Sequence, residues 1–366
     1  MALKKSAVED MVIAAEFWQG KKVFVTGHTG FKGSWLSLWL QQLGAQVTGF
    51  SLAPVNQPNL FEVVNVGEGI NSIIGDICDI NTVKQVFLDT QPDIVIHMAA
   101  QALVRYSYQN PIETYQTNVM GTLHILEAIR ESKSVQSVVI VTTDKCYENK
   151  EWLWPYREND PVGGHDPYSS SKACVELLVA SYRKSYFSGN QKVSIATARA
   201  GNVIGGGDWA EDRLIPDIIK SFRRGETVSI RSPNAIRPWQ HVLEPLSGYL
   251  LLAEKLYGNA GRDYSEAWNF GPTAKGAQSV QWVVEHITQH WKGAMWEINE
   301  GQQLHEAKIL KLDSTKAYEK LGWQPRWELA ETLQKVTGWY LAEQSGMDMK
   351  QICYEQIGLF NKIDCN

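Results

Sequence analysis

Runs of β-branched and other apolar residues alternate with segments of helical periodicity from Lys21 to about Arg199. A strand buried on both faces is apolar along its whole length, whereas a helix that covers a sheet is apolar on one side only. The alternation therefore predicts a parallel sheet with helices on both faces. The predicted strands are 22–26, 46–50, 73–75, 94–97, 137–143 and 193–198, and the predicted helices between them are 33–43, 81–89, 115–130 and 171–185.

A glycine-rich segment, TGHTGFKG at residues 26–33, follows the first predicted strand and opens the first predicted helix. Glycines let the backbone approach phosphate oxygens, and a helix N-terminus offers unpaired N–H groups and a favourable dipole. In this context the segment indicates a dinucleotide site; the alternative is a tight turn that only packs the helix on the strand. The predicted fold class is thus α/β, a Rossmann doubly wound parallel sheet.

Two residues of the loop, His28 and Lys32, stand where such loops usually carry small or apolar side chains. Lys32 either contacts phosphate or is a solvated lysine of the first helical turn. The second strand ends in Gly-Phe-Ser-Leu at 49–52, which has neither an acid for the ribose hydroxyls nor an arginine for a 2′-phosphate. These residues alone leave NAD and NADP open. Asp76 follows the third strand and either contacts adenine or is a solvated loop acid.

The regular alternation ends after Arg199, where a run of glycines at 205–207, a charged predicted helix at 215–224 and a proline-punctuated stretch follow. A chain of 366 residues is long enough for about two or three domains. We interpret the C-terminal third as a smaller, mixed α/β substrate domain. The expected division is 18–200 plus about 228–260 for the dinucleotide domain, and about 201–227 plus 261–360 for the smaller substrate domain.

Composition excludes several other classes of protein. The net charge is −5 and there is no long basic block, which argues against nucleic acid or an anionic membrane surface as partner. No apolar run approaches the ~18 residues that a membrane span needs, and the N-terminus lacks the apolar core of a secretory signal. The five cysteines are scattered, without CxxC spacing. We therefore expect a cytoplasmic protein with neither a disulfide framework nor a metal site.

Tyr168 and Lys172 are four residues apart, so a helix places them on one face. An ammonium beside a phenol lowers the phenol's pKa, which makes Tyr168 a usable base near neutral pH. The Y-x-x-x-K pattern alone is a frequent accident. Here, however, a predicted strand ends in Thr142-Thr143, and the carboxyl ends of parallel strands are where ligands bind. Thr143 would thus bring a hydroxyl beside the phenol.

With these motifs the chain resembles the extended short-chain dehydrogenase/reductase family over roughly residues 20–340. Further matches are Asp76-Ile77, HMAA at 97–100, Asn118 in TNVMGT, RAGNVIG at 199–205 and RPWQHV at 237–242. The resemblance implies the cofactor NAD and a set of residues that bind it: Gly27, His28, Gly30, Phe31, Lys32, Gly33, Asp76, Ile77, Ala99, Ala100, Asn118, Tyr168 and Lys172. It implies Arg105, Asn202, Arg237 and His305 as substrate-binding residues. His97 is expected to be a hydrogen-bonded core histidine.

Within the family the chain is similar to nucleotide-sugar 4,6-dehydratases. Those enzymes follow the catalytic threonine with aspartate and glutamate, whereas this chain reads Thr143-Asp144-Lys145. That departure and the opening FWQGKKVFVTGHTGFKG are similar to the dehydratases that act on CDP-glucose. The resemblance implies hydride transfer from C4 of the hexose to NAD, loss of water across C5 and C6, and hydride return to C6. The product is CDP-4-keto-6-deoxyglucose, used in dideoxysugar synthesis for bacterial surface polysaccharide.

The resemblance also implies roles for the catalytic residues. Tyr168, assisted by Lys172 and Thr143, deprotonates the 4-hydroxyl, and Asp144 protonates the departing 6-hydroxyl. Lys145 is either a base with a strongly lowered pKa or a cation that stabilises the enolate while water removes the C5 proton. Both residues reach the substrate only if the strand has ended before them, because neighbouring residues of a strand point to opposite faces.

Two other functions are possible for such a sequence, and the resemblance also implies an oligomeric state. Another nucleotide-sugar dehydratase or a 4-epimerase of the family is the second candidate, although Asp144 favours elimination. A dinucleotide sensor without catalysis would be expected to lack Tyr168 or Lys172. In the family, helices such as 115–130 and 171–185 pack between subunits, so the resemblance implies a homodimer or higher homo-oligomer.

Overall fold

The computed structural model describes residues 13–189, 192–230, 232–299 and 310–362. Its centre is a seven-stranded sheet in the order β11-β6-β5-β4-β1-β2-β3, and every neighbouring pair is parallel. The strands are β1 Lys22–Thr26, β2 Gln46–Ser51, β3 Asn71–Ile74, β4 Ile94–His97, β5 Ser137–Val141, β6 Ser194–Ala200 and β11 Ala267–Phe270. The strand order reverses between β1 and β4, which is the arrangement of a doubly wound α/β sheet. The predicted fold class is confirmed.

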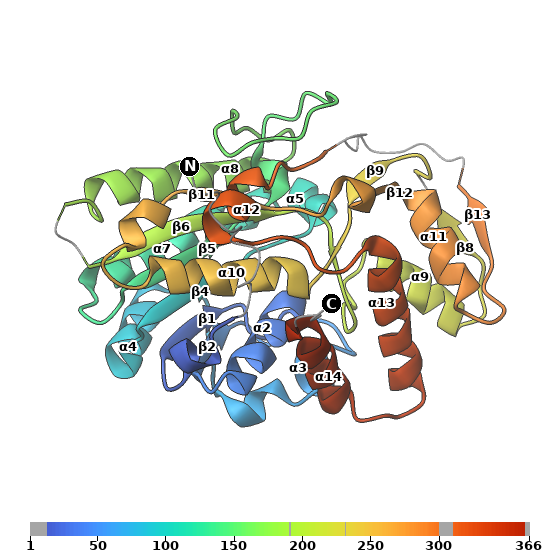
Figure 1. Ribbon diagram of the computed structural model, residues 1–366, viewed down its shortest axis with the longest axis horizontal. Coiled ribbons are helices and arrows are strands. Elements are labelled where there is room, and N and C mark those ends of the chain that lie inside the picture. Colours follow the sequence, from blue (N-terminus) through green and yellow to red (C-terminus); the bar gives the residue numbers. More distant parts are fainter. Residues whose placement is uncertain (1–12, 190–191, 231, 300–309, 363–366) are drawn as a thin grey trace, which may run out of the picture.

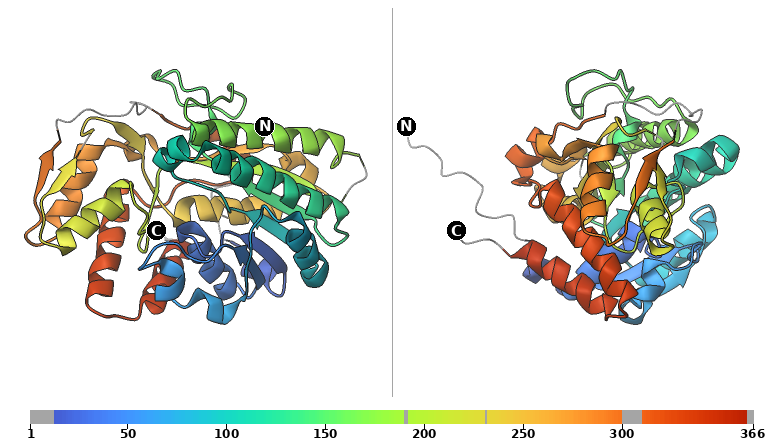
Figure 2. Two further views of the ribbon diagram at one scale, coloured as in Figure 1. Left: turned by 180° about the vertical axis from the view of Figure 1, so that it is seen from behind. Right: turned by 90° about the vertical axis from the view of Figure 1, so that its right-hand side faces the viewer.

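Helices cover both faces of the sheet (Figure 1). One face packs against α4 Ile80–Thr90, α7 Gly121–Glu131 and α8 Pro167–Ser185. The other face packs against α2 Phe31–Gln42 and α10 Leu243–Leu256. Alternate strand residues supply the two cores, so that Phe24 faces the first group of helices while Val23 and Val25 face the second. Seen from behind in Figure 2, α7 and α8 lie side by side across the sheet.

A smaller set of elements lies beyond one end of the sheet, on the right of Figure 1. It contains α9 Leu214–Arg223, α11 Val280–Gln289 and two short strand pairs, β8 Val228–Ile230 with β13 Trp296–Ile298 and β9 Ile236–Pro238 with β12 Ala277–Ser279. A third pair joins β7 Val203–Ile204 to β10 Gln240–His241. The chain then continues through α12 Thr315–Leu321, α13 Leu329–Gln344 and α14 Met349–Asn361, and α14 packs on α2.

The structure differs from the sequence prediction at several places. The predicted helix 115–130 is α6 Pro111–Tyr115, a π-helical turn Gln116–Met120 and then α7. The seventh strand, β11, was not predicted and lies in the range 261–360 that we assigned to the smaller domain. Conversely, β8 begins at residue 228 and pairs outside the main sheet. Short strands such as β8 and β11 carry too few residues for hydrophobic periodicity to distinguish them from loops.

Within the described ranges, no helix combines the length and the apolar character that crossing a membrane requires.

Candidate active site

A cavity of about 1260 Å³ lies along the carboxyl ends of the strands. Segments that follow β1, β3, β4, β5 and β6 line it, and so do residues of α9 and β8 from the smaller set of elements. Ligands of open α/β sheets bind at this edge, outside the reversal of strand order. Typical small-molecule pockets measure about 300–1,000 Å³. The cavity therefore has room for two ligands of nucleotide size, one over the sheet and one toward α9.

The glycine-rich loop forms the floor of the cavity where α2 begins. Gly27 has a φ of +78°, and a Cβ on it would lie 2.9 Å from the backbone nitrogen of Ala99. A Cβ on Gly33 would lie 2.0 Å from the carbonyl oxygen of Gly27. Only glycine at these two positions lets the helix start pack this closely on the strand end. Gly30 and Phe31 also line the cavity, so the loop fits the diphosphate of a dinucleotide.

The side chain of His28 does not lie among the groups that line the cavity. It is buried beneath the loop, with Nε2 2.7 Å from Oγ of Ser72, and its ring fills the space where Gly49 lacks a Cβ. Burial lowers the pKa of His28 to about 4, which leaves the ring neutral. The structure thus gives His28 a packing position, in contrast to the expectation that it contacts the cofactor.

Lys32 does line the cavity, and its Nζ donates to the hydroxyl of Tyr249 at 3.4 Å. Burial, together with the charges of Arg213 and Lys172, lowers the pKa of Lys32 to about 7. Lys32 is thus half-buried at the cavity wall and is not fully solvated. Its contact with a bound phosphate stays a prediction.

The other expected dinucleotide residues divide into two groups. Asp76, Ile77, Ala99 and Ala100 line the cavity. Asn118 is buried in the π-helical turn, where its Oδ1 accepts from the backbone of Gln101 at 2.8 Å and its Nδ2 donates to Ser171 at 2.8 Å. It therefore fastens the loop after β4 to α8 and contributes no surface to the cavity.

His97 is a core histidine, as predicted. Its Nδ1 lies 2.7 Å from Oγ1 of Thr26 and its Nε2 lies 3.0 Å from Oγ1 of Thr122. Burial lowers its pKa to about 3, so the ring is neutral and both nitrogens have partners. The Thr26 hydroxyl also accepts from the backbone nitrogens of Met98 and Ala99, which fixes the cavity wall after β4.

Tyr168 and Lys172 both line the cavity from the first turns of α8. The helix begins at Pro167 because Asp166 caps it, accepting from the backbone of Ser169 at 2.9 Å. Burial raises the pKa of Tyr168 to about 12, against a hydrogen bond with Thr143 and the charge of Arg213, which both lower it. Nζ of Lys172 donates to the carbonyl oxygen of Val141 at 3.2 Å. The cation that lowers the phenol's pKa in this structure is therefore Arg213.

Sequence reasoning missed Arg213, which lines the cavity beside the start of α9 and pairs with Asp208 at 3.0 Å. The charge of Asp208 raises the pKa of its guanidinium further. The residue lies in the segment EDRLIP, which contains no motif that would indicate a functional arginine. Only the fold, which brings the charge of Arg213 close to Tyr168, identifies it as part of the site.

Asp144 is buried at the start of a 3₁₀ turn, Asp144–Cys146, that follows the end of β5 at Val141. Its Oδ1 accepts from Thr143 at 3.1 Å, and its Oδ2 has no hydrogen-bond partner among the described residues. Burial raises the pKa of Asp144, against the charges of Lys145 and Arg237. Because the strand has ended, Asp144 and Lys145 both line the cavity, which meets the geometric condition stated above.

Three of the expected substrate residues line the cavity. Asn202 follows β6, Arg237 lies on β9 with its charge close to Asp144, and Arg105 lies on α5 Val104–Gln109. Nη1 of Arg105 pairs with Asp212 at 3.0 Å, which joins α5 to the segment before α9. His305 lies outside the described residues. Among those residues, no group of three or more His, Cys, Asp or Glu side chains could hold a metal ion.

Comparisons with known proteins place this geometry in a family. The family model described as GDP-mannose 4,6 dehydratase matches residues 24–336. The CDP-glucose 4,6-dehydratase of Salmonella typhimurium is 52% identical over 343 residues, which cover 92% of this chain and 95% of that protein. The dTDP-glucose 4,6-dehydratase of Haemophilus influenzae is 27% identical over 344 residues, covering 88% and 98%.

Solved structures share the fold. The UDP-glucose 4-epimerase of Thermotoga maritima, solved with UDP-glucose, has a TM-score of 0.75 at 25% identity and covers 88% of this chain and 99% of its own. The dTDP-glucose 4,6-dehydratase of Bacillus anthracis, solved with NAD, has a TM-score of 0.74 at 20% identity and covers 91% and 100%. The extent of the family match, the relative at 52% identity and this shared fold together show that the chain belongs to the GDP-mannose 4,6-dehydratase family of extended short-chain dehydrogenases/reductases.

Proposed function

We propose that this protein is an NAD-dependent CDP-glucose 4,6-dehydratase, which converts CDP-glucose to CDP-4-keto-6-deoxyglucose and water. The likeness to the Salmonella enzyme supports the substrate. The observation that carries the reaction type is Asp144, a buried acid whose Oδ2 is unpartnered within the described chain and which lines the same cavity as Tyr168. A 4-epimerase needs only the tyrosine, lysine and threonine. The additional acid favours elimination.

The residues of the loop fit NAD, with Gly27, Gly30 and Gly33 against the diphosphate and Asp76 and Ile77 toward the adenine. When bound, NAD takes up the C4 hydride of the hexose and returns it to C6, so it leaves the reaction unchanged. Strand β2 ends in Ser51, and no acidic side chain lines the cavity at Ser51–Leu52. The protein therefore holds the adenosine ribose without the carboxylate that many dinucleotide sites use.

Tyr168 takes the proton of the 4-hydroxyl, and Thr143 hydrogen-bonds the same oxygen. The pKa of about 12 keeps most of the phenol protonated in the free protein, so the form of Tyr168 that accepts the proton is the phenolate. The charge of Arg213 favours the phenolate. Lys172, one turn further along α8, has a pKa lowered by burial to about 8. Catalytic hydrogen bonds of this kind tighten when substrate completes the site.

Asp144 supplies a proton to the departing 6-hydroxyl. Its raised pKa increases the protonated fraction, and Oδ2 is the atom with a free position for that contact. Oxidation at C4 makes the C5 proton acidic, and Lys145 lies beside Asp144 on the cavity wall. Lys145 either removes that proton or stabilises the enolate while water removes it. Asn202 and Arg237 hold the diphosphate of the sugar nucleotide, Arg237 through charge-assisted hydrogen bonds.

The protein is proposed to be a homodimer or higher homo-oligomer that packs through α6 to α8. Apolar side chains on this surface are exposed in the single chain, among them Ile112 at 74% and Leu177 at 62%. Exposed apolar side chains gathered on neighbouring helices are typical of a subunit interface. Light scattering at micromolar concentration tests the proposal, and a particle of about 41 kDa, the mass of one chain, would contradict it.

The decisive experiment incubates the protein with NAD and, separately, CDP-glucose, dTDP-glucose, UDP-glucose and GDP-mannose. Alkaline ultraviolet absorbance reports a 4-keto-6-deoxysugar, and we expect it with CDP-glucose. Formation of a 4-epimer without that absorbance would show that the protein is an epimerase and not a dehydratase. Absorbance with another sugar nucleotide, and none with CDP-glucose, would show that the protein is a dehydratase with a different substrate.

A further inference from the structure

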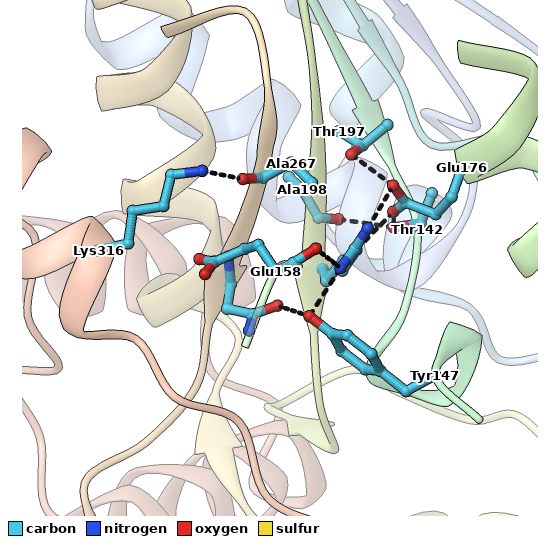
Figure 3. A network of polar contacts seen from close by, with 10 residues as sticks. Thr142, Tyr147, Glu158, Glu176, Thr197, Ala198, Ala267 and Lys316 are labelled. Carbon is cyan, nitrogen blue, oxygen red and sulfur yellow. Dashed lines mark hydrogen bonds and ion pairs between the residues drawn. The ribbon is translucent and has the colours of Figure 1, made fainter. Parts of the chain in front are cut away.

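A buried ion pair joins α8, the helix of Tyr168 and Lys172, to β6, and Figure 3 shows the polar contacts around its glutamate. Glu176 stands one turn beyond Lys172 on α8, and Arg199 stands on β6; their side chains are 5% and 4% exposed and the ion-pair distance is 2.8 Å. The Glu176 carboxylate accepts from Nε and Nη2 of Arg199 at 2.9 and 2.8 Å. A buried charge is stable only when paired and fully hydrogen-bonded, which this carboxylate achieves.

Two threonine hydroxyls complete the bonding of the carboxylate. Thr142 donates to Oε1 of Glu176 at 2.5 Å, and Thr197 donates to Oε2 at 2.7 Å. Thr142 directly precedes the catalytic Thr143 at the end of β5, whereas Thr197 lies in the middle of β6. The two hydroxyls are both buried and chemically alike, but only one belongs to the catalytic segment.

Arg199 extends the contact to the far end of the turn that carries Asp144. Its Nη1 donates to the hydroxyl of Tyr147 at 2.7 Å, and Tyr147 is the residue that follows the Asp144–Cys146 turn. The Tyr147 hydroxyl in turn donates to Oδ1 of Asn269 on β11 at 2.7 Å. The ion pair is thus bonded on both sides of residues 143–146 and, through Glu176, to the helix of Tyr168 and Lys172.

We propose, on the basis of the function proposed above, that Thr142, Glu176, Arg199 and Tyr147 form a positioning clamp that holds the Thr143–Lys145 segment in register with Tyr168 and Lys172. None of these four residues has an assigned role in the reaction. Hydride transfer and proton transfer both require alignment within fractions of an ångström, so loosening this clamp lowers turnover more than substrate affinity.

The clamp also influences the charge on Lys172. Burial lowers the pKa of Lys172, whereas the Glu176 carboxylate one turn away and Cys146 raise it. Lys32 from α2 and His97 from β4 also interact electrostatically with this ammonium. Because the charge of Arg199 keeps Glu176 ionised against the effect of burial, Arg199 acts through Glu176 on the lysine.

The test uses the matched variants Thr142→Val and Thr197→Val in the full-length protein with NAD and CDP-glucose. Each removes one buried hydroxyl from the same carboxylate. We expect kcat to fall about 10- to 100-fold in Thr142→Val with KM unchanged, and to stay within about twofold of the parent in Thr197→Val. Thr142→Ser restores the hydroxyl and should restore kcat. Unchanged kcat in Thr142→Val, or equal losses in both variants, would overturn the proposal.

A second readout separates this proposal from the substrate assignment. Amide hydrogen exchange of peptides covering 142–147, measured without substrate, should accelerate in Thr142→Val and not in Thr197→Val. Equal exchange in the two variants would refute the clamp even if the parent converts CDP-glucose. The measurement needs no substrate, so it stays valid if the parent proves inactive toward CDP-glucose. If Thr142→Val does not fold, Tyr147→Phe tests the other side of the clamp, where a parent-like kcat would contradict the proposal.

Discussion

Thr143 donates a hydrogen bond to Oδ1 of Asp144 at 3.1 Å and so orients the carboxyl group that follows it in the chain. The other oxygen, Oδ2, is buried and has no partner among the described residues. A Cβ on Gly201 would lie 3.1 Å from this oxygen, so the glycine leaves the space beside the acid open. Thr143 therefore orients Asp144, and Oδ2 of Asp144 is available to a substrate.

This arrangement predicts that Asp144→Asn separates oxidation from elimination. The amide keeps the shape of the side chain but cannot deliver a proton, and a missing general acid typically costs about 10²- to 10⁴-fold in rate. C4 oxidation relies on Tyr168 and should survive, so reduced cofactor should accumulate while product formation falls. Stopped-flow absorbance and product assay measure the two events. Asp217→Asn, on another wall of the cavity, is the matched control, and equal rates in both variants would remove Asp144 from the mechanism.

Tyr168→Phe should remove most of kcat and spare sugar-nucleotide affinity. The phenolate forms as hydride leaves, so the interaction is made mainly in the transition state. Steady-state kinetics and calorimetric binding of CDP-glucose measure the two quantities. Tyr108→Phe, an exposed tyrosine that also lines the cavity, should behave like the parent. A near-native kcat in Tyr168→Phe would refute the role of the phenol.

The missing acid at the end of β2 predicts modest, readily exchanged NAD binding. Protein purified without added cofactor should gain activity when NAD is supplied. Mass spectrometry under native conditions reports the bound fraction before and after dialysis. Full occupancy after dialysis would refute weak binding, whereas full activity with no detectable dinucleotide would overturn the redox mechanism itself.

Stability should fall with rising pH because of Glu244 on α10. Burial raises its pKa from 4.5 to about 8, against hydrogen bonds from the backbone nitrogens of Arg326 and Trp327 and the charge of Arg326, while Glu331 adds to the rise. Between these two pKa values the folded protein holds a proton that the unfolded chain has lost. Glu244 alone should therefore contribute a decline of about 1.4 kcal/mol in the free energy of unfolding for each pH unit in this window.

Urea unfolding from pH 5 to pH 8 checks this slope, with Glu244→Gln expected to flatten it. Glu319→Gln, an exposed glutamate on α12, should leave the slope as it is in the parent. A slope in Glu244→Gln equal to that of the parent would contradict the contribution of Glu244.

Much of the central fold could be predicted because its signals are local. Each of these signals can be recognised from a few consecutive residues, as in the continuous apolar runs of β1 and β4 and in the glycine-rich loop. The predicted helix 115–130 missed the π-helical turn, because that turn is stabilised by tertiary bonds such as those of Asn118 with Gln101 and Ser171. The strand β11 pairs with β6 across a long separation in sequence, which no local pattern reports.

The site was predictable where a spaced motif carries it, as for Tyr168 with Lys172. Arg213 and Glu176 were not predicted, since each is one charged residue whose importance comes from what the fold places against it. The same reason explains His28: its place in the loop motif indicates cofactor contact, yet the side chain turns beneath the loop because Gly49 leaves room there. Sequence fixes a residue's backbone position more reliably than the direction of its side chain.

Lys145 is the residue whose role the next experiment decides. It lies next to Asp144 on the cavity wall, where the family pattern has a glutamate. Lys145→Glu restores that glutamate and should retain turnover if position 145 is where the C5 base belongs. Lys145→Met removes both charge and basicity while keeping the length of the side chain.

The readout is exchange of the substrate's C5 proton with solvent deuterium, measured beside product formation. If Lys145 is the base, Lys145→Met abolishes exchange and Lys145→Glu restores it. If Lys145 stabilises the enolate as a cation, Lys145→Glu is as slow as Lys145→Met or slower, because a second negative charge then opposes the developing enolate oxygen. Normal product formation in both Lys145→Met and Asp144→Asn would show that this pair has no catalytic role, and the elimination step would have to be carried by other groups of the cavity.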